Sequence, residues 1–282
     1  MQDDWLARLA QCLDFAASPA AVPSSLLPAL QQACALGATP FEVIAGTPVA
    51  RYGPRVTLTA GPSPTALAAH CGLHDHPYGA ASWIGLRIHQ DGHLHVKAYH
   101  KFSPTLRGPG PDGSWPLPAS LPAGLVPVMA AQDGDAYELY LRLKDRCSWA
   151  DFSKACLALL PTEADALPGI PFSPWPQPAA GAFCVSLRWQ QQNLSAITLY
   201  ADHRALPEDA QVRAQWSCDM SEHERHAYEM ALHAVRASGP RRAPWHAMLA
   251  WSVDVKGTWH RAASLRVPHP RTGPTIDTES PC

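Results

Sequence analysis

The chain carries little charge of either sign. Only 16% of its 282 residues are Asp, Glu, Lys or Arg, and the formal net charge is −2 with neutral histidines. A protein that binds nucleic acid through its phosphates needs a broad basic surface. The composition therefore argues against a nucleic-acid partner, and any site for an anion has to be local.

Long hydrophobic runs are also missing. No apolar stretch approaches the roughly 20 residues of a membrane-spanning helix, and the opening MQDDWLARLA lacks the basic and apolar segments of a signal peptide. We therefore expect a cytoplasmic protein with no membrane partner. The 46% hydrophobic content still suffices for a large core, which predicts a single domain over residues 1–282.

Metal-binding motifs are absent as well. The eight cysteines are scattered, and none forms a CxxC pair, so we expect free thiols in a reducing compartment rather than disulfides or zinc ligands. The histidines of HCGLHDHPY match no settled ligand spacing, and there is no DDxxD motif for a magnesium diphosphate. We expect no cofactor; Mg²⁺ is compatible with the sequence but not required.

What the sequence does contain is a series of stretches in which apolar and polar residues alternate. This period of two is typical of strands. Turn signals such as QDG join several of the stretches into hairpins. Five strand pairs are predicted, at 40–46 with 54–61, 82–89 with 93–102, 124–131 with 135–143, 182–190 with 194–202, and 246–255 with 259–267.

Helical patterns lie before, between or after these pairs. We expect helices within 1–37 and at 63–73, 148–160 and 221–238. Ser148 is a suitable N-cap, and Ser221 and Glu224 have the spacing of a capping box. Three segments are expected to be irregular: the Pro-rich 108–124, where a helix is short or missing, the surface loop 161–181 and the tail 268–282.

The polar face of the predicted strands is unusual in its tyrosines. His95, Lys97 and Tyr99 alternate with apolar residues, and Tyr140 and Tyr200 lie on the polar faces of later strands. An open sheet with this face in water is one interpretation. Because ten strands without a protected edge are better closed, we favour an α+β fold with a closed ten-stranded antiparallel barrel, helices outside, and a polar, aromatic interior that holds a ligand.

Several motifs resemble the ABBA prenyltransferases, in particular their dimethylallyltryptophan synthase (indole prenyltransferase) branch. TPFEVIAGTPVARYGPRVTLTAGPS is similar to the family's first strand pair, and VKAY to its Lys-x-Tyr motif, while ELY and TLY fall where later strands carry a tyrosine. The resemblance implies a ten-stranded barrel of repeated αββα units, with the active site in its interior.

The resemblance also implies roles for individual residues. Glu42 would hold the indole nitrogen. The chemistry itself also requires a base that removes the ring proton, and we expect Glu42 or His95 in that role. Arg55, Lys97 and Tyr99 would bind the diphosphate. Tyr99, Tyr140 and Tyr200 would form the tyrosine shield around the prenyl group.

The third and fifth strand pairs depart from the family's pattern. Ala136 and Glu138 replace the Arg and Lys of an Arg-x-Lys-x-Tyr run, and Arg266 stands where a tyrosine is usual. We therefore expect either that Arg87, Arg142, Arg188 or Arg266 rebuilds the diphosphate site, or that the donor is bound in another way.

The resulting hypothesis is an aromatic prenyltransferase. It would transfer a dimethylallyl group from its diphosphate to an indole or tryptophan-derived acceptor, with small molecules as its partners and a monomer or weak homodimer as its oligomeric state. Two alternatives remain: an ABBA enzyme for phenolic or peptide acceptors, and a non-catalytic barrel that binds a ligand.

Overall fold

A computed structural model of the chain describes residues 31, 35, 39–46, 52–59, 83–89, 94–160, 180–218, 220, 222–237 and 244–266. Gln31 and Ala35 are helical, as expected for the second helix within 1–37. The rest of the N-terminal helices, the helix at 63–73, most of the 161–181 loop, the 268–282 tail and the Ser221 cap lie outside the described residues.

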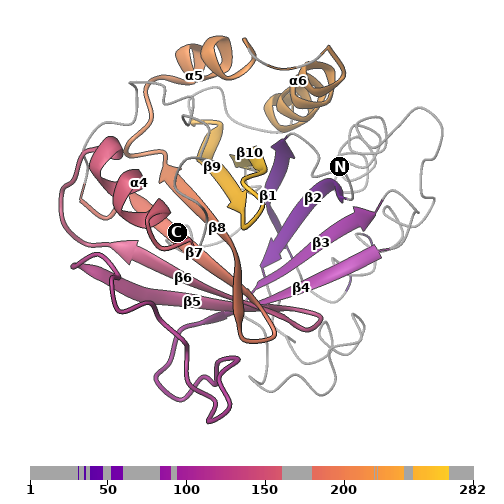
Figure 1. Ribbon diagram of the computed structural model, residues 1–282. Helices are drawn as coiled ribbons and strands as arrows, with labels where there is room; N and C mark the ends of the chain where they lie inside the picture. The colour runs from indigo at the N-terminus through magenta and orange to yellow at the C-terminus, as the bar shows by residue number, and fades with distance from the viewer. Residues whose placement is uncertain are drawn as a thin grey trace, which may run out of the picture. The chain divides into compact units, whose positions relative to one another are not determined.

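All ten predicted strands are present (Figure 1). They are β1 (Thr39–Gly46), β2 (Tyr52–Thr59), β3 (Trp83–His89), β4 (Leu94–Lys101), β5 (Leu125–Asp133), β6 (Ala136–Leu143), β7 (Phe183–Gln190), β8 (Asn193–Asp202), β9 (His246–Asp254) and β10 (Trp259–Arg266). The helices whose bounds are described are α4 (Trp149–Leu157), α5 (Asp209–Trp216) and α6 (Glu222–Ala237).

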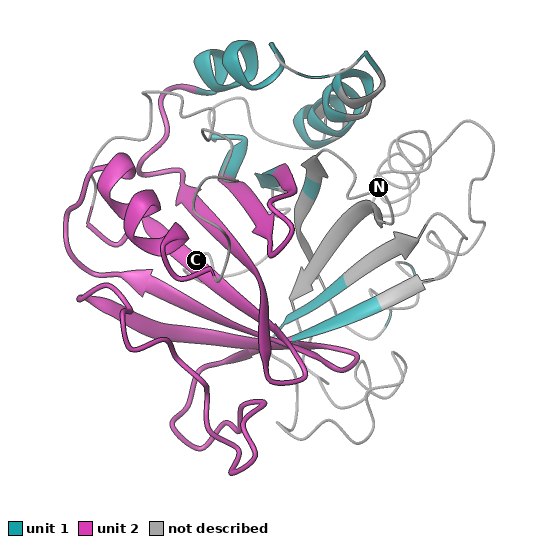
Figure 2. Ribbon diagram, viewed as in Figure 1, with its two compact units in different colours: residues 1–98, 209–247, 262–278 teal, residues 99–208, 248–261, 279–282 magenta. Residues whose placement is uncertain are grey.

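The chain folds into two compact units, coloured separately in Figure 2. Unit 1 comprises residues 1–98, 209–247 and 262–278, and unit 2 comprises 99–208, 248–261 and 279–282. In unit 1, β1 pairs with β10 and with β2, and β2 pairs with β3, all antiparallel. In unit 2, β5 to β9 are antiparallel neighbours in sequence order and form a curled sheet.

One face of the unit 2 sheet is apolar and packs against α4. Leu139, Leu187 and Leu199 on this face have no exposed surface. The ring of Trp149 on α4 lies 5.2 Å from that of Phe183 and 4.8 Å from that of Trp251, measured between centroids. The α4 helix begins as predicted, because the Ser148 hydroxyl accepts a hydrogen bond from the Asp151 amide at 3.1 Å. The alternation expected for these strands is therefore confirmed.

The Pro-rich segment covers another part of this apolar face without forming a helix. The ring of Trp115 lies 6.5 Å from that of Tyr137 and 5.7 Å from that of Trp189, which are cross-strand partners on β6 and β7. The Trp115 indole N–H donates to the Leu106 carbonyl at 3.1 Å, which fixes the ring within its own loop. A folded loop thus takes the place of the missing helix.

Helix α5 is a helix that the sequence analysis did not predict. Its residues DAQVRAQW give only a weak apolar stripe, of which Val212 and Trp216 are buried. The available signal was Pro207 followed by two acidic residues, a common start for a helix. Helix α6 was predicted, and it packs against β1.

A buried polar network joins α5 and α6 to the start of β9. The Asp209 carboxylate accepts hydrogen bonds from the Trp245 amide at 2.7 Å, the His246 amide at 3.1 Å and the His246 Nδ1 at 2.7 Å. The other ring nitrogen of His246 lies 2.6 Å from the Tyr228 hydroxyl on α6. Burial raises the pKa of Tyr228, so its hydroxyl stays protonated and forms a hydrogen bond with that nitrogen. The network fixes both helices to the strand.

This network predicts a pH-dependent contribution to stability. Burial alone would raise the pKa of Asp209, but the hydrogen bonds from His246 and Trp245 outweigh it and lower the pKa below its ordinary value. A depressed carboxyl pKa stabilises the fold above the unfolded pKa of about 3.9. That contribution is lost as the pH falls through the folded pKa. The difference in unfolding free energy between wild type and Asp209→Asn should shrink from pH 7 to pH 3 in urea titrations.

The control for this prediction is Arg213→Gln on α5. Arg213 forms an ion pair with Glu229 of α6 that is exposed to solvent at both side chains. Exposed pairs contribute little to stability, so we expect its stability to follow that of wild type across the same range. A gap for Asp209→Asn that stays constant from pH 7 to pH 3 would contradict the assignment.

The cysteines of the described residues are free thiols, as expected. Cys156 and Cys184 are buried, while Cys147 is half-buried and Cys218 is exposed. Burial raises the pKa of Cys156 to about 12, which keeps this thiol protonated and unreactive. None of the described helices is long and apolar enough to cross a membrane.

Candidate functional site

Three tyrosines form a row on the polar face of unit 2. The ring of Tyr140 on β6 lies 6.1 Å from that of Tyr99 on β4 and 5.9 Å from that of Tyr200 on β8. These centroid distances are typical of aromatic contacts. Because a further strand lies between each pair, the rings meet only where the sheet curls toward this face. The structure thus brings together the three residues expected to form the shield.

Hydroxyl contacts hold the β8 end of this row. The Tyr200 hydroxyl lies 3.2 Å from the Ser186 hydroxyl on β7, and Ser186 is almost fully buried. On the same face, the Thr198 hydroxyl donates to that of Ser252 at 3.0 Å. Side chains fixed in this way present a preorganised aromatic surface.

One side of the row, toward the start of β6, is acidic. Glu138, two residues before Tyr140, is buried and is the cross-strand partner of Arg188. The Arg188 guanidinium donates to the Asp133 carboxylate at 3.0 Å. This part of unit 2 therefore contains the carboxylates of Asp133 and Glu138, and the Arg188 guanidinium is already in an ion pair with Asp133. The diphosphate-binding role of Arg188 stays a prediction, and this ion pair competes with it.

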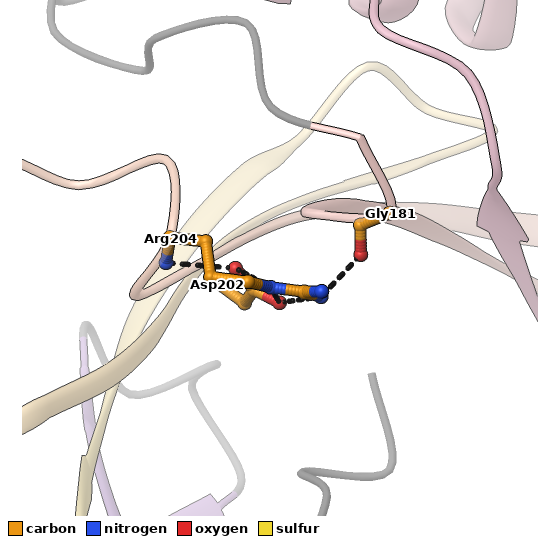
Figure 3. A network of polar contacts seen from close by, with 3 residues as sticks. All are labelled: Gly181, Asp202 and Arg204. Atoms are coloured by element: carbon orange, nitrogen blue, oxygen red, sulfur yellow. Dashed lines mark hydrogen bonds and ion pairs between the residues drawn. The ribbon is translucent and has the colours of Figure 1, made fainter.

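The other side of the row, toward the end of β6, is basic. Arg142 is half-buried opposite Cys184, and its side chain passes close to Gly181. Arg204 binds both the Asp202 carboxylate and the Gly181 carbonyl, which ties the turn after β8 to the start of β7 (Figure 3). Gly181 has a φ of +67°, which glycine adopts without strain. Arg142 thus borders a rigid turn, and its diphosphate role also stays a prediction.

Lys97 is buried on β4 with only 2% of its surface exposed. It shares a face of the strand with Tyr99, while Ala98 and His100 occupy the other face. A lysine is rarely buried to this extent unless its charge is compensated. By the same alternation, His95 belongs to the face of Lys97. The structure describes the backbone of His95 but not its side chain.

In unit 1 the strand register places the predicted residues on one face. Directly opposite residues of antiparallel strands share a face. Glu42 on β1 is opposite Arg266 on β10 and Thr57 on β2. One row further along, Ile44 is opposite Arg55 and Ser264, and Arg55 is opposite Arg87 on β3.

One of these rows contains two opposite charges, and the other contains two like charges. Glu42 and Arg266 are of opposite sign, an arrangement that stabilises a pair of strands. Arg55 and Arg87 are directly opposite and of the same sign, which destabilises the pair unless an anion lies between them. The register of unit 1 therefore puts the predicted base opposite one arginine and two further arginines opposite each other.

Sequence reasoning missed the partners of the predicted residues. Ser186 and Ser264 follow the alternation onto the polar faces of β7 and β10, but no role was expected for either, and the Asp133–Arg188 ion pair was not detected. The only available signal was the alternation itself. Among the described residues, no three His, Cys, Asp or Glu side chains gather in a way that would hold a metal ion.

Comparison with solved structures identifies the fold. The 5-dimethylallyl tryptophan synthase from Streptomyces coelicolor, in complex with DMASPP and Trp, matches with a TM-score of 0.61 at 16% identity over 98% of both chains. The 6-dimethylallyltryptophan synthase from Micromonospora olivasterospora, also with DMASPP and Trp, matches with a TM-score of 0.57 at 15% identity, over 95% of this chain and 98% of that chain.

A third structure agrees. The prenyltransferase PriB, in a ternary complex with L-tryptophan and dimethylallyl thiolodiphosphate, matches with a TM-score of 0.58 at 16% identity, over 97% of this chain and 99% of that one. No family model and no curated protein matches the sequence. The chain has the fold of the ABBA prenyltransferases. Its structural neighbours are dimethylallyltryptophan synthases, which confirms at the level of the fold the resemblance stated from the sequence.

Proposed function

We propose that the protein is an aromatic prenyltransferase that moves a dimethylallyl group from its diphosphate to tryptophan or a tryptophan-derived acceptor. The observation that carries the proposal is the row of Tyr99, Tyr140 and Tyr200 on the strands that follow the predicted pattern. The neighbours with this fold that contain tryptophan and a dimethylallyl donor analogue support the same substrates.

We also propose that the strands of both units close into one ten-stranded barrel, which makes residues 1–282 a single domain. The pairing of the first strand with the last, β1 with β10, supports closure, because an open meander leaves both of these strands as edges. The polar faces of both units would then line the interior.

The proposed reaction begins with heterolysis of the carbon–oxygen bond of the donor. The bonding electrons leave with the diphosphate, and Arg55, Lys97 and Arg266 stabilise the charge that develops there through charge-assisted hydrogen bonds. The allyl cation that remains is stabilised by the faces of the tyrosines, which also exclude water. This chemistry needs no metal ion.

The acceptor then attacks the cation. Glu42 accepts the hydrogen bond of the indole N–H, which raises the nucleophilicity of the ring, and a carbon–carbon bond forms to the allyl group. The ring proton has to leave to restore aromaticity, and Glu42 or His95 accepts it.

A second candidate function is a barrel that binds a ligand without catalysis. Buried Glu138 favours it, because a carboxylate beside the tyrosine row repels a diphosphate and attracts a cation. A phenolic or peptide acceptor is a further alternative for the enzyme, and Glu42 favours an N–H donor over it.

The experiment incubates the protein with dimethylallyl diphosphate and tryptophan in the presence of EDTA. The expected product is tryptophan heavier by one dimethylallyl group, detected by mass spectrometry, and Glu42→Gln should lose turnover. A panel of tryptophan dipeptides and phenols in the same assay separates the alternative acceptors. An absence of any prenylated product, with tryptophan binding retained in calorimetry, would favour the binding barrel instead.

A further inference from the structure

Ser264 on β10 is a buried hydroxyl group that lacks a hydrogen-bond partner. Only 3% of its surface is exposed, and its Oγ contacts no donor or acceptor among the described residues. Ala263 and Leu265 on either side are fully buried on the opposite, apolar face. Leaving a buried hydroxyl unpaired costs free energy, and such a group in a folded protein calls for an explanation.

The neighbours of Ser264 on its own face are those of the candidate site. The register places Ser264 opposite Ile44, which in turn is opposite Arg55, and Arg55 is opposite Arg87. Arg266, two residues along β10, shares the face of Ser264 and is opposite Glu42. Ser264 therefore lies in the row of the two opposed arginines and next to the row of the predicted base.

The chemistry of this face indicates an anionic ligand. Two arginines on adjacent strands favour an anion between them because both are positively charged. Guanidinium groups also match the geometry of phosphate oxygens. Ile44, between Arg55 and Ser264, offers no polar group. A ligand that satisfies both ends of the row must therefore carry several acceptor oxygens, as a diphosphate does.

We propose that Ser264 is a binding residue of the donor site, whose hydroxyl donates a hydrogen bond to an oxygen of the diphosphate. This rests on the proposed function, and it adds a neutral donor to the cations Arg55, Lys97 and Arg266. This role also explains the unpaired hydroxyl. The hydrogen bond that is missing in the free protein forms when the ligand binds.

The test compares Ser264→Ala with wild type in two measurements. Because a hydrogen bond to a charged group is lost, the dissociation constant for inorganic diphosphate in calorimetry should rise about tenfold or more. The thermal midpoint of the free protein should rise as well, because the variant no longer buries an unpaired polar group. Weaker binding together with higher stability is the expected result.

Ser195→Ala on β8 is the matched control. The Ser195 hydroxyl already donates to the Arg188 carbonyl at 3.0 Å, so its removal should lower the thermal midpoint and leave diphosphate binding unchanged. A Ser264→Ala protein that binds diphosphate as wild type does, or that is less stable than wild type, would overturn the proposal.

The same samples separate this proposal from the proposed function. If wild type prenylates tryptophan and binds diphosphate while Ser264→Ala binds it equally well, only the role of Ser264 is wrong. If wild type neither binds diphosphate nor forms a prenylated product, both proposals fail.

Discussion

Replacing Lys97 by methionine is expected to lower the rate of prenyl transfer by about 100- to 1,000-fold, the usual loss for one group that stabilises developing charge. The ammonium group is buried on the face of Tyr99, where a low dielectric strengthens its interaction with the departing diphosphate. Methionine retains most of the volume and the apolar stem, so packing is largely kept. The measurement is kcat with saturating donor and tryptophan.

Lys101 supplies the control on the same strand. It follows Lys97 by four residues, shares its face by alternation and is exposed to solvent. Lys101→Met removes an equal charge from the chain and should leave kcat unchanged. Circular dichroism of both variants checks that they are folded. A folded Lys97→Met protein with wild-type kcat would refute the role of this lysine in diphosphate departure.

The strands and their faces were predictable because alternation is a local property of the sequence. It placed Tyr137 and Leu139 on one face and Tyr140 on the other. The ring contacts agree, because Tyr137 meets Trp115 whereas Tyr140 meets Tyr99 and Tyr200. The register between strands is not local. Turn signals fix it within a hairpin such as β5–β6, but the sequence contains no comparable signal for the pairing of β1 with β10.

The contact between the tyrosine rings required the curl of the sheet. Alternation assigns Tyr99, Tyr140 and Tyr200 to polar faces, yet the three strands are separated by β5 and β7. Only a curled sheet brings the rings to about 6 Å from one another. The expectation of curvature came from the lack of a protected edge in a ten-stranded sheet and from the resemblance to the ABBA family, because no single motif of the chain encodes it.

The partners of polar and charged side chains were the least predictable part of the site. Arg188 and Ser264 both lie on the polar faces expected from the sequence. In the folded chain Arg188 forms an ion pair with Asp133, whereas the Ser264 hydroxyl has no partner among the described residues. These opposite outcomes depend on which side chains the neighbouring strands present, and hence on the register.

Replacing Tyr140 by leucine is expected to slow prenyl transfer by about 30-fold. Tyr140 is the central ring of the row and is 5% exposed. A desolvated cation–π contact contributes about 2 kcal/mol, and about 1.4 kcal/mol corresponds to a factor of ten in rate. Because leucine also shields the cation from water less well, the ratio of dimethylallyl alcohol to prenylated tryptophan should rise. Liquid chromatography of both products measures this ratio.

Two further variants assign the effect to the aromatic face at this position. Tyr140→Phe keeps the ring and should retain most of the rate with an unchanged product ratio. Tyr137→Leu removes a tyrosine from the opposite face of β6, where the ring contacts Trp115. It should lower the thermal midpoint and leave the product ratio at the wild-type value. If Tyr140→Leu and Tyr137→Leu changed the ratio equally, the effect would come from loosened packing, and the tyrosine row would not be the surface that shields the cation.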